Sequence, residues 1–336
     1  MLIIRINFSM ERNMQLVINT YGSYLRKNGD CFVVKNEDNA LEISAKKVTG
    51  ILITAGALVS TDALQFAVES NIDVVFLDKY GNPYGRVWHA KLGSTASIRR
   101  KQLEISETIE GLELAKQWCV KKVGNQLDFI ARLKRPRKDK AEVLEDAIKS
   151  LIETITKIES VTGTIADKRG TVMAFEGAAG KVYFDALNNV MPERFRFKGR
   201  SRNPAKDEFN AMLNYGYGVL YSQVEKACIV AGLDPYVGFL HTDDYNKKSL
   251  VFDLIEMFRI FAEQTVVHLF SGRKVKVEFF EQAKGGYTLN RDGKSVLIGA
   301  LNDTLDTSVR YRGRNIQRRN IIQLECHRIA NEMLKC

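Results

Sequence analysis

The pattern of apolar residues changes near residue 93, and this change limits the fold of the 336-residue chain more than any other feature. Before it, apolar residues form short or alternating runs separated by turn residues, a pattern typical of β-strands. After it, they recur at helical spacing in long stretches rich in Glu, Lys, Leu and Ala. We therefore expect an α+β fold, with a mainly β N-terminal domain over residues 14–93 and a larger all-α domain over residues 94–336.

The β domain is expected to contain short strands and one short helix. Asn28-Gly29 predicts a hairpin turn, because both residue types tolerate positive φ. Ser60 is expected to begin the helix as its N-cap residue. The edges of such a sheet can pair with a second copy of the chain, so this domain is the expected site of dimerisation. The strand-like runs cover residues 16–18, 31–34, 48–54, 73–77 and 84–88.

The second domain is expected to consist of long amphipathic helices. Breaks are expected at Pro136, around Pro192–Pro204 and at Gly232–Pro235, where turn residues interrupt the helical pattern. The helices are expected over residues 97–133, 139–160, 168–190, 207–231, 249–270 and 295–334.

The charge of the chain is basic and unevenly placed. Its 50 Lys and Arg against 40 Asp and Glu give a formal net charge of +10, of which residues 1–95 contribute only +1. A basic surface on the helical domain is the electrostatic footprint of a protein that binds a polyanion such as nucleic acid, although many proteins of this charge bind none.

Other features narrow the class of protein. Apolar stretches such as Gly50–Val59 are too short to span a bilayer and the N-terminus lacks the pattern of a secretory signal, so a cytoplasmic protein without a membrane partner is expected. Five cysteines without a C-x-x-C pair indicate neither a disulfide framework nor a thiolate zinc site. The chain has no complete P-loop, no H-E-x-x-H and no G-x-S-x-G, which argues against P-loop proteins, zinc peptidases and α/β-hydrolases.

Glu176 lies in an apolar stripe. Met173, Gly180, Tyr183 and Leu187 recur at helical spacing around it and should face the core. A carboxylate there would be desolvated, at a cost of several kcal/mol or with a raised pKa, unless a cation or good hydrogen-bond donors meet it. Glu176 is therefore either a candidate ligand of a cation or one half of a buried Glu–Arg pair.

Two further acids flank an apolar stripe in the segment 249–270. Asp253 and Glu256 are three residues apart, so both carboxylates can point at one place, where a divalent cation would relieve their repulsion. The alternative is that Glu256 forms a surface ion pair with Arg259 or Lys248.

His241 stands in the loop just before this acidic helix, in a good position for a metal ligand. A single histidine is more often structural than ligating, but together with Glu176 and the acids at 253 and 256 it outranks any one of these residues alone. Such a mixed nitrogen and oxygen site suits Mn²⁺ or Mg²⁺ better than Zn²⁺.

Basic residues gather in three segments of the helical domain. One segment is interleaved with Phe195 and Phe197, so that arginines could bind phosphates while the rings stack on bases; each cluster could also be a solvated surface. A divalent metal held by carboxylates beside such arginines is typical of enzymes that act on phosphodiesters. The clusters are Arg194, Arg196, Lys198, Arg200, Arg202 and Lys206; Arg310, Arg312, Arg314, Arg318 and Arg319; and Lys134, Arg135, Arg137 and Lys138.

Four motifs follow one another in the helical domain. They are F-E-G-A-A-G-K-V-Y-F at 175–184, R-S-R-N-P at 200–204 with Asp207 and Asn210, G-F-L-H at 238–241 and F-D-L-I-E-M-F-R at 252–259. Together they resemble the CRISPR-associated Cas-one family, the integrase-nucleases of CRISPR adaptation. The resemblance extends from about Met14 to the C-terminus and implies a β domain followed by a helical catalytic domain. Residues 1–13 precede the usual start and are expected to be an extension foreign to the fold, and Ala205 stands where the family often has a second proline.

The resemblance implies a metal site and an activity. Glu176, His241 and Glu256 would hold the ion, Mn²⁺ or Mg²⁺, with Asp253 in a supporting position. Such an enzyme would join the 3′-hydroxyl ends of short DNA duplexes to a repeat array by transesterification. It could also cut DNA, branched forms included.

The resemblance also implies partners. Arg200, Arg202 and Arg259, in or beside the motifs, are expected to contact DNA, namely a protospacer duplex and the CRISPR repeat. A homodimer formed through the β domain and a small Cas-two partner protein are expected as well. Two alternatives remain open at this point: a repair-type nuclease that cuts branched DNA, and a non-catalytic architectural protein that holds DNA on its basic face.

Overall fold

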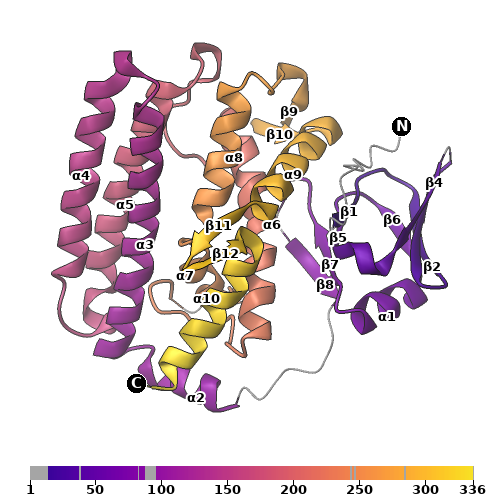
Figure 1. Ribbon diagram of the computed structural model, residues 1–336, viewed down its shortest axis with the longest axis horizontal. Coiled ribbons are helices and arrows are strands. Elements are labelled where there is room, and N and C mark those ends of the chain that lie inside the picture. The colour runs from indigo at the N-terminus through magenta and orange to yellow at the C-terminus, as the bar shows by residue number, and fades with distance from the viewer. Residues whose placement is uncertain are drawn as a thin grey trace.

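The computed structural model shows an α+β protein in which strands precede helices, as the sequence pattern predicts (Figure 1). The mainly β part lies to one side of the larger helical part. The structure describes residues 14–37, 39–81, 83–87, 96–242, 244–245, 247–283 and 285–335. The prediction made for residues 1–13 lies outside these described residues.

The β part contains two four-stranded sheets. Its strands are β1 (Met14–Ile18), β2 (Ser23–Asn28), β3 (Cys31–Lys35), β4 (Ala40–Ser44), β5 (Val48–Ile53), β6 (Ala57–Val59), β7 (Asp73–Leu77) and β8 (Pro83–Val87). The strand order is β1–β5–β7–β8 in the first sheet and β4–β3–β2–β6 in the second. The expected hairpin joins β2 and β3, but Asn28 pairs with Cys31 in the ladder, and Gly29 carries the positive φ of 54°.

The two sheets share one apolar core with the helix α1 (Thr61–Glu69). Leu25 of the second sheet and Ile51 of the first are fully buried in it. Ser60 caps the helix as expected, because its hydroxyl oxygen accepts a hydrogen bond from the Ala63 N–H.

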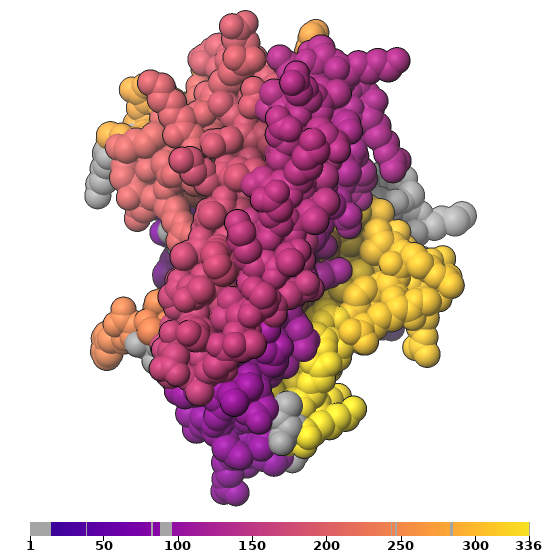
Figure 2. Space-filling model, turned by 90° about the vertical axis from the view of Figure 1, so that its left-hand side faces the viewer, coloured from indigo at the N-terminus to yellow at the C-terminus, as the bar shows by residue number. Residues whose placement is uncertain are grey.

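The helical part forms two groups of helices. They are α2 (Ala96–Ile105), α3 (Ile109–Lys134), α4 (Ala141–Glu159), α5 (Ile165–Val190), α6 (Glu208–Val230), α7 (Ser249–Ile255), α8 (Arg259–Ser271), α9 (Arg291–Asp306) and α10 (Arg318–Met333). The long helices α3, α4 and α5 pack together, and α6, α8, α9 and α10 lie between them and the β part (Figure 1). Figure 2 shows the outer face of α3–α5, with α10 in yellow beside α2 at the lower end. Within the described ranges, no helix is both long and apolar enough to cross a membrane.

Two expected helices are interrupted by short breaks. The segment 97–133 breaks at residues 106–108, where the Thr108 hydroxyl accepts from the Gly111 N–H and so caps α3. The segment 249–270 breaks between α7 and α8, and this break carries Glu256.

The helical part also contains two short hairpins that the helical pattern did not predict. One lies inside the expected helix 295–334, and the other precedes α9. Gly285 and Gly313 supply positive φ values of 76° and 83° at their turns. The hairpin strands are β9 (Phe280–Ala283), β10 (Gly286–Leu289), β11 (Ser308–Tyr311) and β12 (Arg314–Gln317).

A buried ion network joins the β part to the helical part. Arg86 on β8 lies 3.2 Å from Asp73 of β7 and 3.2 Å from Glu225 of α6, and it donates to the Ser222 carbonyl. Gly81, just before β8, touches α6 so closely that an added Cβ would collide with Tyr215. The chain around Gly81 is therefore held against α6, at the edge of the cavity described below.

Candidate active site

Two of the predicted ligands, Glu176 and Glu256, both contact the side chain of Lys122, which belongs to none of the sequence motifs. Glu176 comes from the middle of α5, and Glu256 is the residue that follows α7. The ammonium of Lys122, on α3, contacts Glu176 Oε1 and lies 2.5 Å from Glu256 Oε2. Two carboxylates from separate helices therefore face one cation.

The charges of this cluster are largely buried, so each one needs an opposite charge nearby. The side chains of Lys122 and Glu256 are only 8% and 9% exposed, whereas that of Glu176 is 25% exposed. Burial alone would raise the pKa of Glu256, but Arg259 and Lys122 outweigh it and lower that pKa to about 2. Burial also opposes the charge of Lys122, yet Glu256 and Glu176 raise its pKa above the ordinary value. Both Lys122 and Glu256 are thus held charged.

Arg259 closes the other side of Glu256. Its Nη2 lies 2.7 Å from Glu256 Oε1, and both side chains are largely buried, so this pair is not the surface ion pair considered as an alternative. Lys248, the other partner considered, pairs with Glu225. The Arg259 guanidinium also lies over the Tyr217 ring, 4.6 Å from its centroid. Glu256 is therefore fixed between two cations.

Asp253 holds the loop that carries His241. Its buried carboxylate accepts hydrogen bonds from the backbone N–H groups of Phe239, Leu240 and His241, at 2.6, 3.1 and 3.0 Å. Its Oδ1 also lies 2.7 Å from His241 Nδ1, which orients the ring and leaves Nε2 for another partner. Asp253 is therefore engaged with the loop, whereas Glu256 faces the cations.

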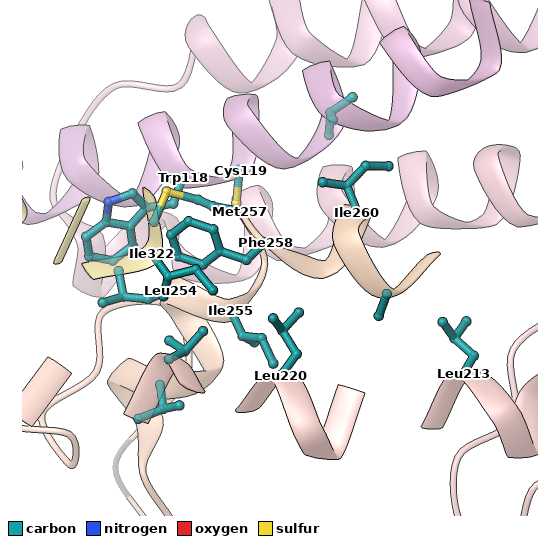
Figure 3. Packing of buried hydrophobic residues seen from close by; sticks show 14 of the residues in the cluster. Trp118, Cys119, Leu213, Leu220, Leu254, Ile255, Met257, Phe258, Ile260 and Ile322 are labelled. Carbon is teal, nitrogen blue, oxygen red and sulfur yellow. The ribbon is translucent and has the colours of Figure 1, made fainter. Parts of the chain in front are cut away.

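The break between α7 and α8 sets the position of Glu256. Met257, which follows it, is buried close to Trp118 of α3 (Figure 3). Asn125 of the same helix donates a hydrogen bond of 2.9 Å to the Met257 carbonyl. Because Lys122 lies one turn after Trp118, this packing brings the junction and the ammonium together.

The predicted ligands do not by themselves form a closed metal cluster. Across the ranges that the structure describes, no three His, Cys, Asp or Glu side chains converge as a metal site would require. Glu176 and Glu256 converge on the Lys122 ammonium, and His241 lies near enough to help lower the pKa of Glu256. Two carboxylates that share a cation, with an oriented imidazole nearby, are a donor set that fits a divalent ion.

The sequence contains a signal that could have identified Lys122. Cys119, Val123 and Gln126 belong to the buried face of α3, and Lys122 lies among them. A lysine on a buried helix face needs an opposite charge for the same reason that Glu176 does. The buried face of α3 and the apolar stripe around Glu176, considered together, would have suggested an ion pair between Lys122 and Glu176.

A cavity of about 380 Å³ adjoins the cluster. Arg259, which pairs with Glu256, forms part of its wall, as do the predicted DNA contacts Arg200 and Arg202. No acidic side chain is among the described residues that line it, so its lining suits phosphates and bases. The basic and aromatic lining residues are Lys79, Arg200, Arg202, Lys248, Arg259, Tyr80, Tyr215, Tyr217, Tyr221, Phe252 and Tyr287.

The two arginines of the R-S-R-N-P motif have different environments. Arg200 donates to Asn210 Oδ1 and, at 2.8 Å, to Asn214 Oδ1, so much of its guanidinium is committed to the protein. Burial lowers the pKa of Arg200, and the nearby charges of Arg259 and Arg202 act in the same direction. Arg202 is exposed and is the better placed of the two to meet a phosphate.

The two phenylalanines between the basic residues do not face a ligand. Phe197 stacks on Phe209 with 4.2 Å between ring centroids, and Phe195 packs edge-on against Phe270 at 5.0 Å. The expectation that these rings stack on bases is therefore wrong, because they anchor the basic loop to the core.

The chain was compared with known protein families, with curated proteins and with solved structures. A family model described as CRISPR associated protein Cas1 matches residues 16–303. A CRISPR-associated endonuclease Cas1 from Archaeoglobus fulgidus is 36% identical over 330 residues, which cover 94% of this chain and 95% of that protein. The fold resembles a casposase bound to integration product (TM-score 0.81, 22% identity, covering 96% of this chain and 90% of that chain). It also resembles a chain of a Cas6-RT-Cas1–Cas2 complex (TM-score 0.77, 21% identity, covering 96% of this chain and 35% of that chain).

The family match and the relative from Archaeoglobus fulgidus confirm the resemblance that the four motifs carry. Both extend over the β part and the helical part, and the family match includes Glu176, His241 and Glu256. The chain belongs to the CRISPR-associated Cas1 family.

Proposed function

We propose that the protein is a metal-dependent DNA endonuclease and integrase of CRISPR adaptation. It joins the 3′-hydroxyl ends of short DNA duplexes to the repeat array by transesterification, and it also cuts DNA. The observation that carries this proposal is that the Glu176–Lys122–Glu256 cluster adjoins a cavity with a basic and aromatic lining. The name of the Archaeoglobus fulgidus relative, an endonuclease, supports it.

In this proposal Glu176, Glu256 and His241 hold a Mn²⁺ or Mg²⁺ ion. The donor set supports this assignment, because two carboxylate oxygens already face one cation, the Lys122 ammonium. Asp253 keeps the His241 ring oriented through Nδ1, so that Nε2 can serve as the third ligand. When bound, the ion supplies polarisation of the scissile phosphate and activation of the attacking oxygen.

The cavity beside the cluster supports DNA as the substrate. Arg202 binds phosphates, and Arg259 links the cavity wall to Glu256. The casposase of similar fold is bound to an integration product, which supports DNA as the ligand here. The Cas6-RT-Cas1–Cas2 complex likewise supports a small Cas2 partner, and we expect the active form to be a homodimer joined through the β part.

Strand-joining and cleavage assays on the same purified protein test the proposal. Each assay is run with Mn²⁺, with Mg²⁺ and with EDTA, in the presence and absence of the small partner protein. Both reactions should require a divalent ion and should be lost in Glu176→Gln, while DNA affinity stays close to that of the wild type, because the ion acts on the scissile phosphate alone.

The outcomes separate the remaining alternatives. Cutting of branched DNA without any joining would favour a repair-type nuclease. DNA binding without either reaction, at every ion tested, would favour an architectural protein. Full activity in EDTA would refute the metal-dependent chemistry.

A further inference from the structure

Lys122 occupies the position between the two carboxylates of the proposed metal site. It is the buried member of a lysine pair on α3, since its neighbour Lys121 is exposed. Its ammonium contacts one oxygen of Glu176 and one oxygen of Glu256. The charge of Lys122 is therefore placed where the two acids face each other.

The oxygens of Glu256 are divided between two cations. Arg259 lies 2.7 Å from Oε1, whereas Lys122 lies 2.5 Å from Oε2. With Oε1 facing Arg259, Oε2 is the oxygen that remains to be shared with Glu176. A divalent ion that joins Glu176 to Glu256 must therefore use the oxygen that Lys122 now faces.

Electrostatics explains why a cation is needed there even before a metal binds. Two carboxylates that face each other across a buried space repel unless a compensating charge lies between them. Lys122 supplies that charge, because its ammonium contacts both acids. The lysine thus holds both ligands in place.

We propose that Lys122 and the divalent ion compete for the same two carboxylates, which makes Lys122 a positioning residue of the metal site. The inference rests on the proposed function to the extent that Glu176 and Glu256 are metal ligands. In the metal-free protein the ammonium stands where the ion would bind and holds Glu176 and Glu256 on either side of it. The ion displaces the ammonium, so its affinity is reduced by the strength of the contacts that it must break.

Lys122→Met tests this competition, because methionine has a similar length and no charge. The control is Lys121→Met, which makes the same change in net charge on the next, exposed residue of α3. Binding of Mn²⁺ to the full chain, without DNA, is measured by electron paramagnetic resonance, and thermal unfolding is followed in EDTA and in Mn²⁺. A third variant, Lys122→Arg, retains the positive charge.

Competition predicts a result that a purely structural role for Lys122 cannot produce. Lys122→Met should melt at a lower temperature than the wild type in EDTA, yet bind Mn²⁺ more tightly, by at least about tenfold. Added Mn²⁺ should restore its melting temperature. Lys121→Met and Lys122→Arg should bind Mn²⁺ as the wild type does.

Other results would overturn the inference. Equal or weaker Mn²⁺ binding by Lys122→Met contradicts competition, as does a variant that is unfolded in EDTA and stays unfolded at saturating Mn²⁺. If the wild type binds Mn²⁺ and Glu256→Gln does not, such a result refutes only the role of Lys122 and leaves the metal site standing. If the wild type binds no Mn²⁺, the metal site and the role of Lys122 fail together.

Discussion

Among single residues, Glu176 and Glu256 face the same ammonium, but Glu256 is more buried and also pairs with Arg259. Glu256→Gln leaves two buried cations without their shared charge, which should lower the free energy of unfolding by about 3–5 kcal/mol. Glu176→Gln leaves Glu256 in place for both cations, so its cost should be only about 1 kcal/mol. Urea unfolding in EDTA measures both, and equal losses would contradict the difference in burial.

The low pKa of Glu256 predicts a dependence of stability on pH. Its folded-state pKa of about 2 lies below the ordinary value of 4.5. The contribution of Glu256 is therefore complete above about pH 4.5 and is lost as the pH falls towards 2. The difference in unfolding free energy between the wild type and Glu256→Gln should shrink across this range. A difference that stays constant from pH 5 to pH 3 in urea titrations would show that Glu256 is not held charged.

Asp253 and Glu256 should differ in their response to metal. Asp253→Asn weakens the orientation of His241, an effect that typically costs about 10–100-fold in metal affinity or activity. Glu256→Gln removes a charge that faces the cation itself. We therefore expect excess Mn²⁺ to restore DNA cleavage partly in Asp253→Asn but not in Glu256→Gln, measured across a metal titration. Rescue in the reverse order would mean that the two acids have exchanged roles.

The residues of the site could be predicted from the sequence only in part. The motifs identified Glu176, Asp253, Glu256 and His241, because acids in apolar stripes and a histidine beside them can be recognised from the sequence alone. Lys122 belongs to none of these motifs and lies 54 positions from Glu176, so only the packing of α3 against α5 brings the two together.

For secondary structure elements, helical periodicity indicated where the long helices lie but not where they are interrupted. The break after α7 cannot be recognised from the apolar pattern. Met257 and Phe258 lie in the break, yet both are apolar and buried, as they would be in a continuous helix. The stripe around Glu176 is shifted by one residue at its start, where Val172 is buried and Met173 is exposed, whereas Tyr183 and Leu187 are buried as predicted. Periodicity reports which residues are apolar, whereas a break depends on tertiary contacts such as the Asn125 bond to the junction.

The loop between α5 and α6 should contain one DNA contact and one structural arginine. Arg202→Ala should reduce DNA affinity on all sequences and lower the salt slope by about one, without loss of stability, because Arg202 is exposed. Arg200→Ala should also destabilise the fold by about 1–3 kcal/mol, since it removes the hydrogen bonds that the Arg200 guanidinium donates to Asn210 Oδ1 and Asn214 Oδ1. Binding at several salt concentrations and urea unfolding distinguish the two. If Arg202→Ala keeps the slope of the wild type, Arg202 is a solvated side chain.

In the molecule as a whole, the cavity is built from both parts of the chain. Lys79, Tyr80 and Pro83 come from the β part, and most of the remaining lining comes from α6 and the segments packed on it. The sequence predicted two parts and a basic surplus on the second. It could not predict that residues after β7 and at the start of β8 would line the cavity, because their position depends on the ion pairs of Arg86.

The β part should also be the dimer contact, and its edge strand β6 offers the clearest test. Leu58 on β6 is 68% exposed and pairs across the ladder with Tyr24, which is 40% exposed. A carboxylate buried there without a partner would cost several kcal/mol, so Leu58→Glu should weaken the dimer by at least about tenfold while leaving the monomer as stable as before. Leu103→Glu on α2, at 60% exposure, makes the same change in the helical part and should leave the dimer intact. Light scattering across a dilution series decides between them, and a dimer that survives Leu58→Glu but dissociates in Leu103→Glu would show that the helices hold the pair together.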